Sequence, residues 1–178
     1  IDGNRYARTR FEYTHIDNQL TKVTVPYDLA GPVASEAYSF QYLRLPDAMV
    51  AISQVMTPMG GQEIIRYNSN GHQYDARLYI PVVTYWEQNP GRGQPSVVRS
   101  YNYSPNRNFT GYPLNGGFRQ GQDNLYRVDS EYAYWAEETY VDNNGKPLRS
   151  TRATYNRFHL LTEELICLLY TSPSPRDA

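Results

Sequence analysis

The sequence contains a single cysteine, Cys167, and it lies in the C-terminal segment 167–178, which is not expected to be native. The rest of the chain therefore offers no disulfide framework and no thiol nucleophile. Positive charge is not in excess either, because 17 basic and 18 acidic residues give a formal net charge of −1. Nucleic acids and anionic membranes attract clustered Lys and Arg, so this balance argues against both as partners. No apolar run approaches the roughly 20 residues that span a bilayer as a helix.

Patterns typical of catalytic and metal sites are also missing. The histidines, His15, His72 and His159, are far apart, and none has a His or Cys at metal-ligand spacing. The acidic pairs 137–138 and 163–164 are adjacent in sequence, and adjacent strand residues point to opposite faces. No Gly-x-Ser-x-Gly occurs, and no glycine-rich loop is followed by Lys-Ser/Thr. We therefore expect no enzyme activity, no catalytic residue, no metal site and no cofactor.

Tyrosine is the abundant residue type, with 18 copies against 5 phenylalanines and 2 tryptophans. A tyrosine ring packs well on a pleated surface while its hydroxyl reaches water, so tyrosine favours half-buried strands. Proline and glycine number 12 each, which suits many short strands separated by turns. The composition therefore predicts an all-β protein.

Six segments follow one plan: an alternating apolar and polar run, a polar turn, then a second alternating run. Such hairpins are marginal alone, because each needs neighbours to cover its edges and one face. We predict an all-β fold of stacked antiparallel hairpins that forms part of a curved open sheet or hollow shell. The asparagine- and glycine-rich residues 106–123 are expected to be a solvated loop. The expected turns are residues 15–18, 45–48, 68–71 and 142–145, and the first strand of a sixth hairpin unit is expected to start at residue 155.

Two aromatic pairs suggest an alternative function. Tyr85-Trp86 and Tyr134-Trp135 have Asn and Gln nearby and could line a surface on which sugar rings stack. A self-contained β-sandwich or propeller that binds glycans would use them in this way. The simpler interpretation is a set of cross-strand aromatic pairs, each contributing roughly 0.2–1 kcal/mol, which explains why tyrosine occurs in every segment.

A strand bearing tyrosine, then an Asp/Asn-Gly turn, then Leu-x-x-Val-x-x-Pro is the pattern of YD repeats. Residues 13–26, 66–72 and 154–160 resemble such repeats, and residues 93–95 and 122–126 resemble the spacers between them. Over most of its length the chain thus resembles the YD-repeat (RHS-repeat) proteins of bacterial insecticidal toxin complexes. Several turns lack glycine, and the spacing of the repeats varies.

The resemblance implies a structural role in a large toxin that is secreted or held at the bacterial cell surface. In such proteins a ribbon of hairpins forms a hollow shell around a toxic C-terminal domain. The implied partners are neighbouring YD repeats, of the same chain or of a partner shell chain, and the enclosed toxic domain. The core segment at which family members cut themselves has no counterpart in this sequence, so no cleavage residue is implied.

The two ends of the sequence carry a separate expectation. Residues 167–177 resemble the in-frame translation of an adapter used in sequencing libraries, so we exclude residues 167–178 from the native chain. Residues 1–166 are then expected to form one repeat-built segment with no internal boundary. The first residue is Ile1 and not methionine, which predicts that the natural chain begins further upstream.

Overall fold

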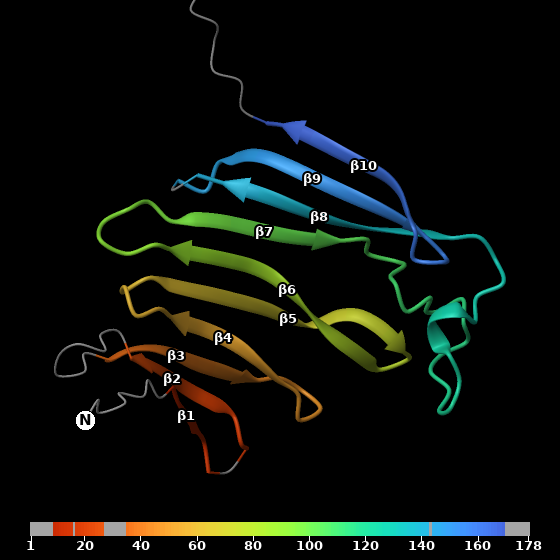
Figure 1. Ribbon diagram of the computed structural model, residues 1–178. Helices are drawn as coiled ribbons and strands as arrows, with labels where there is room; N and C mark the ends of the chain where they lie inside the picture. The colour runs from red at the N-terminus through yellow and green to blue at the C-terminus, as the bar shows by residue number, and fades with distance from the viewer. Residues whose placement is uncertain (1–8, 16, 27–34, 143, 170–178) are drawn as a thin grey trace, which may run out of the picture. The chain divides into compact units, whose positions relative to one another are not determined.

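The computed structural model describes residues 9–15, 17–26, 35–142 and 144–169, which form an all-β protein. Ten strands pair in chain order, from β1 to β10, in one antiparallel sheet that does not close on itself (Figure 1). The predicted fold class of antiparallel hairpins in an open sheet is confirmed. Among the described residues, the helical structure is limited to the 3-10 turn η1 (Asn124–Tyr126). The strands are β1 (Arg10–Tyr13), β2 (Leu20–Pro26), β3 (Ser35–Arg44), β4 (Val50–Met56), β5 (Gln62–Asp75), β6 (Leu78–Asn89), β7 (Val97–Tyr103), β8 (Ala133–Val141), β9 (Pro147–Asn156) and β10 (Leu161–Leu168).

The chain divides into two compact units, and strands β5 and β6 contribute residues to both. The first unit contains residues 1–65 and 87–96, and the second contains residues 66–86 and 97–178. In the first unit, the predicted turn at residues 45–48 joins β3 to β4. Asp47 and Ala48 have φ values of 59° and 58° there, the left-handed backbone that a tight hairpin turn requires.

Hydrophobic burial is sparse in both units. Val82, Val128 and Tyr132 are the buried hydrophobic residues among those described, and all three belong to the second unit. The units therefore depend on strand pairing and half-buried aromatic side chains more than on a conventional core.

Two hairpin turns of the second unit share one hydrogen-bond arrangement. Oδ1 of Asp142 and of Asn156 accepts from the backbone N–H four residues later, at 2.8 and 3.1 Å. Three residues after each acceptor the backbone is left-handed: Gly145 in the first turn has a φ of 77°, and His159 in the second has a φ of 62°. In the first unit, Thr57 Oγ1 accepts from the N–H four residues later in the same way, at 3.0 Å. A short polar side chain at the first position thus closes each turn, which is why Asp and Asn suit it.

The predicted turn at 142–145 is confirmed, but the strand expected to begin at residue 155 is wrong. Tyr155 and Asn156 end β9, and the chain turns before β10 starts at Leu161. The Asn156 carboxamide accepts from the N–H of Phe158 at 2.9 Å as well as from that of Leu160. Phe158 and His159, which the sequence pattern places in a strand, therefore lie in a turn.

Replacing Asn156 by alanine is expected to destabilise the second unit by about 1 kcal/mol, because both turn hydrogen bonds lose their acceptor. Asn156→Asp keeps the acceptor oxygen and is expected to retain the stability of the parent chain. Urea unfolding of the two variants and the parent measures the difference. Equal loss in both variants would show that the side-chain oxygen does not close the turn.

The predicted turn at residues 68–71 is also wrong, because β5 runs straight through it. The Asn-Ser-Asn-Gly sequence has the composition of a turn, but Gly71 serves another purpose. A Cβ built on Gly71 would lie 2.6 Å from the Ile80 carbonyl oxygen and 2.6 Å from Val82 Cγ1 on β6. Glycine is therefore required here by the close approach of the neighbouring strand.

In the long segment between β7 and β8, the expected solvated loop at residues 106–123 is confirmed where residues 118–123 are exposed, but it is wrong for residues 108–115, part of which packs against β5. Asn108, Thr110 and Asn115 are buried in this segment. Asn108 Nδ2 and Thr110 Oγ1 both donate to the Gln73 carbonyl oxygen on β5, at 3.0 and 2.8 Å. The sequence predicts that these polar residues are exposed to water, but in the structure they form hydrogen bonds with backbone groups inside the unit.

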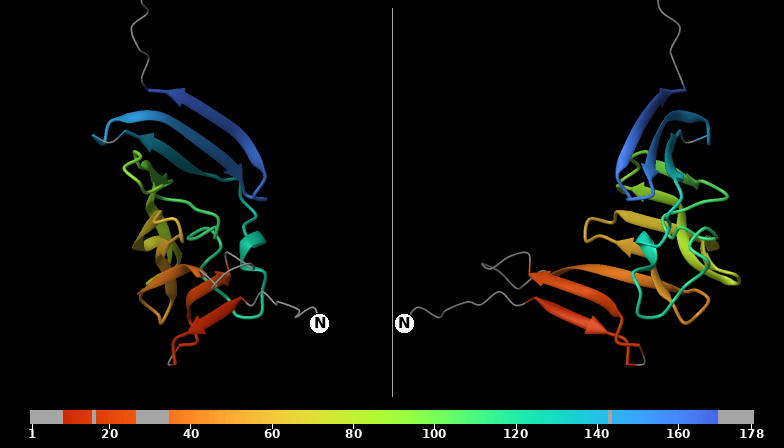
Figure 2. Two further views of the ribbon diagram at one scale, coloured as in Figure 1. Left: turned by 60° about the vertical axis from the view of Figure 1, so that its left-hand side comes forward. Right: turned by 90° about the vertical axis from the view of Figure 1, so that its right-hand side faces the viewer.

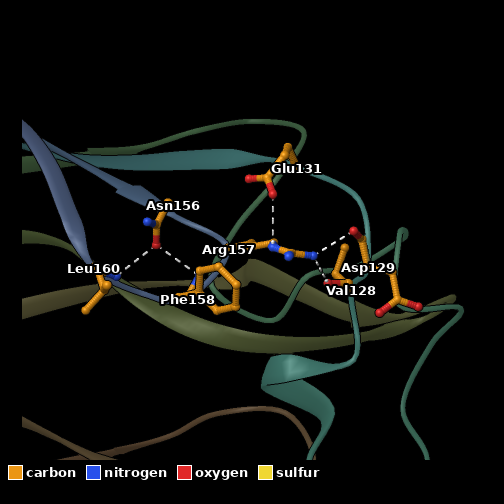
Figure 3. Close-up of polar contacts among 7 residues, drawn as sticks. All are labelled: Val128, Asp129, Glu131, Asn156, Arg157, Phe158 and Leu160. Atoms are coloured by element: carbon orange, nitrogen blue, oxygen red, sulfur yellow. Dashed lines mark hydrogen bonds and ion pairs between the residues drawn. The ribbon is translucent and has the colours of Figure 1, made fainter.

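The C-terminal end of this segment, next to β8, is bonded to the turn between β9 and β10. Figure 3 shows Arg157 reaching from the turn to Glu131 and to the two carbonyl groups of Val128 and Asp129. Its Nη1 donates to these carbonyl oxygens at 3.1 and 2.6 Å, and its Nε lies 3.2 Å from Glu131 Oε1. One arginine thus fixes where the segment enters β8.

Strand β10 is the outermost strand of the second unit. It pairs along β9 from Leu161↔Tyr155 to Leu168↔Arg149, and both views of Figure 2 show β8, β9 and β10 lying side by side with β10 outside. The adapter-like residues 167–178 are described as far as Leu169, and the remainder lie outside the described residues. Cys167 and Leu168 form the last two residues of β10.

Candidate functional site

The four aromatic residues singled out in the sequence lie on two strands of the second unit. Tyr85 and Trp86 are neighbours on β6, and Tyr134 and Trp135 are neighbours on β8. Neighbouring residues on a strand point to opposite faces of the sheet. The four rings therefore do not gather on one surface, although one ring from each strand can share a face.

Arginine side chains cover one face of three of these rings. Each guanidinium carbon lies 4.2–4.7 Å from a ring centroid, in the pairs Arg66 with Tyr85, Arg99 with Trp86, and Arg152 with Trp135. Two of these arginines also form ion pairs with β8, Arg99 with Glu138 at 2.9 Å and Arg152 with Glu137 at 3.2 Å. The rings are thus part of cross-strand ladders, in which stacking under a cation contributes about 0.5–1 kcal/mol at an exposed site.

The fourth ring, Tyr134, is packed among other aromatic rings. Its centroid lies 5.3 Å from that of Tyr155 and 6.3 Å from that of Tyr132, and both pairs are stacked. Its hydroxyl lies 3.0 Å from His159 Nδ1. Burial, with smaller contributions from the neighbouring tyrosines, raises the pKa of Tyr134 to about 12, so the hydroxyl keeps its proton at neutral pH. Glycan binding through these four rings stays a prediction, and their arrangement provides no surface that all four share.

A polar cleft lies elsewhere in the second unit, between β5, β6, β7 and the segment that follows β7. Its volume is about 580 Å³, and its lining includes Asn68, Asn70, His72, Tyr101, Tyr103 and Asn106. The described residues that line it include no Asp, Glu, Lys or Arg. Burial lowers the pKa of His72 below its usual value of 6.5, so the imidazole is neutral at pH 7. The cleft is therefore uncharged and rich in amides and hydroxyls.

The walls of the cleft are held by contacts within the unit. The His72 ring meets the rings of Tyr103 and Phe109 edge-on, with centroids 4.9 and 5.2 Å apart. The Tyr103 hydroxyl donates to the Val83 carbonyl oxygen at 2.9 Å. With the bonds from Asn108 and Thr110 to β5, these contacts fix the aromatic side of the cleft before any ligand arrives.

A second hollow of about 590 Å³ lies beside the same segment. Its apolar lining includes Tyr74, Leu78, Ile80, Phe109 and Phe118. Polar residues, among them Asp123, line the rest of this hollow.

The sequence does not predict the polar cleft, because the composition of its parts indicates a turn at residues 68–71 and a solvated loop at residues 106–123. The usable signal is the spacing Asn68-x-Asn70-x-His72, whose period of two places all three side chains on one face of a strand. The turn-like composition of the same residues masks this period.

Comparison of the chain with family models, with curated proteins and with solved structures finds no match. Among the described residues, no helix has the length and apolar character needed to cross a membrane. Within the same residues, no three His, Cys, Asp or Glu side chains are grouped so that they could hold a metal ion.

Proposed function

We propose that the chain is a non-enzymatic wall segment of a large bacterial toxin of the YD-repeat kind, secreted or held at the cell surface. Its hairpins would form part of a β-strand shell that encloses a toxic C-terminal domain. The observation that carries the proposal is an open sheet whose two outermost strands, β1 and β10, present apolar side chains with no described strand beyond them.

The apolar side chains of these edge strands support pairing with further hairpins. Phe11 and Tyr13 on β1 are more than half exposed, and so is Ile166 on β10. Leu165, also on β10, is 50% exposed. Exposed apolar edges are a liability for a lone protein, because unpaired N–H and C=O groups there recruit other strands. They are expected where the next hairpin of a longer ribbon completes the sheet.

The recurring turn is the second support. Asp142 and Asn156 close their turns with the same pair of side-chain hydrogen bonds, to the N–H groups two and four residues on. Residues 154–160, which resemble a YD repeat in sequence, contain one of these turns. A ribbon that repeats one hairpin needs such a turn, because the turn fixes the register between successive strands.

The alternative, a self-contained module that binds glycans through Tyr85, Trp86, Tyr134 and Trp135, is less well supported. It requires closed edges and a shared aromatic surface. The sheet is open, and these rings lie on both of its faces, three of them under arginines.

Sequencing the source DNA upstream of Ile1 and across the junction at Leu165 tests the proposal directly. We expect the reading frame to continue through many more Tyr–turn–Leu hairpins and into an unrelated C-terminal domain. A frame that opens with a signal peptide just before Ile1 and stops soon after Glu164 would instead define a small secreted module, and the wall proposal would fail.

A further inference from the structure

The polar cleft of the second unit has the features of a ligand site that are independent of any role in a wall. Its volume of about 580 Å³ falls within the range of about 300–1,000 Å³ that is usual for small-molecule sites. All of its lining residues belong to the second unit, so its shape depends on that unit alone.

The chemistry of the lining excludes most ligand classes. An anion would find no cationic side chain among the described lining residues, and a cation would find no carboxylate. An apolar ligand would leave the amides and hydroxyls without hydrogen-bond partners, which costs binding energy. Neutral polar ligands remain, and one that carries many hydroxyl groups matches a lining of amides and hydroxyls.

The two sides of the cleft suit the two sides of a sugar ring. Asn68 and Asn70 are exposed on one face of β5, and a carboxamide both donates to and accepts from neighbouring hydroxyls. Asn68 Oδ1 also accepts from the Asn70 backbone N–H at 3.0 Å, which leaves its amide N–H groups and one lone pair for a ligand. The rings of Tyr101 and Tyr103 lie on β7 and offer aromatic surface to the C–H face of a sugar. Burial raises the pKa of both tyrosines, so their hydroxyls remain protonated.

The cleft is also organised in advance, because Tyr103, His72 and the segment after β7 are fixed by the contacts described above. A site that needs no rearrangement loses less entropy when its ligand binds. We propose that this cleft binds a short, neutral oligosaccharide, with Asn68 and Asn70 as its hydrogen-bonding groups and Tyr101 as its stacking surface.

Saturation-transfer NMR with the full 178-residue chain tests the proposal. The probes are neutral cello-, malto-, chito- and galacto-oligosaccharides, a sulfated oligosaccharide and a neutral Gly/Ser peptide. The method reads the signals of the small ligand, so self-association of the chain does not hide binding. We expect at least one neutral oligosaccharide to receive saturation, and neither the sulfated sugar nor the peptide to do so.

The double variant Asn68→Ala/Asn70→Ala is expected to bind about tenfold more weakly, since two hydrogen-bonding amides are lost. The matched control, Gln41→Ala/Asn144→Ala, removes two exposed amides outside the cleft and should bind as the parent does. Circular dichroism of each variant checks that the strands are retained. The proposal is overturned if no neutral sugar binds, if the sulfated sugar or the peptide is preferred, or if the folded cleft variant binds unchanged. If the cleft variant does not fold, Tyr101→Ala takes its place with the same expectation.

Discussion

Replacing Leu165 and Ile166 by lysine is expected to convert a self-associating chain into a monomer. Both side chains are about half exposed on β10, the outermost strand of the second unit. A charged side chain on an edge strand opposes pairing with another strand, because the ammonium group would have to lose its water. The parent chain keeps an apolar edge and should pair with other copies at micromolar to millimolar concentration.

Size-exclusion chromatography with light scattering measures this change as a shift from larger species to the mass of a single chain. The matched control is Met59→Lys/Leu114→Lys, which adds the same charge at exposed apolar positions away from β1 and β10. This control should associate as the parent does. If the parent chain is already monomeric at micromolar to millimolar concentration, its edge strands do not pair with other copies, and this result would count against the wall proposal.

Replacing Gly71 by alanine is expected to destabilise the second unit by about 1–3 kcal/mol, the usual cost of overpacking. The new Cβ would meet two backbone atoms of β6, the Ile80 carbonyl oxygen at 2.6 Å and the Val82 nitrogen at 2.8 Å. Backbone atoms inside a paired strand cannot move aside as a side-chain tip can. Val82 is buried as well, so its side chain has little room to yield.

The sign of this effect is informative, because alanine normally improves a strand interior relative to glycine by roughly 0.5–1 kcal/mol. Without the close approach of β6, Gly71→Ala should therefore stabilise the protein. The control Ser69→Ala, on the same strand, should change the free energy of unfolding by less than about 0.5 kcal/mol. Urea unfolding and hydrogen exchange of the β5 and β6 amides distinguish these outcomes.

Fold class and several turns could be predicted from the sequence, because alternation and turn chemistry are local signals. The turns at residues 45–48 and 142–145 depend on residues next to each other in the chain. Gly71 could not be assigned correctly, because the reason for it lies on β6, at Ile80 and Val82. Composition alone cannot distinguish a glycine that lets the chain turn from a glycine that lets a neighbour approach.

The candidate sites show the same limit. Tyr85, Trp86, Tyr134 and Trp135 are conspicuous in the sequence, but their partners are arginines and tyrosines on other strands. The polar cleft is not predictable from sequence patterns, because it is assembled from β5, β6, β7 and a segment whose composition predicts a loop exposed to water. The long segment lies beside β5 through its two hydrogen bonds to the Gln73 carbonyl oxygen, a contact between residues more than 30 positions apart in the chain.

The turn shared by Asp142 and Asn156 has a consequence for how such a chain can change in length. Each turn fixes the register of its two strands by bonds within five consecutive residues, so it requires nothing from the rest of the sheet. A gene segment that encodes one whole hairpin can then be duplicated or deleted, and the strands on either side can still pair. Natural variants of this protein are accordingly expected to differ by whole pairs of strands, with insertions of other sizes confined to loops such as the one after β7.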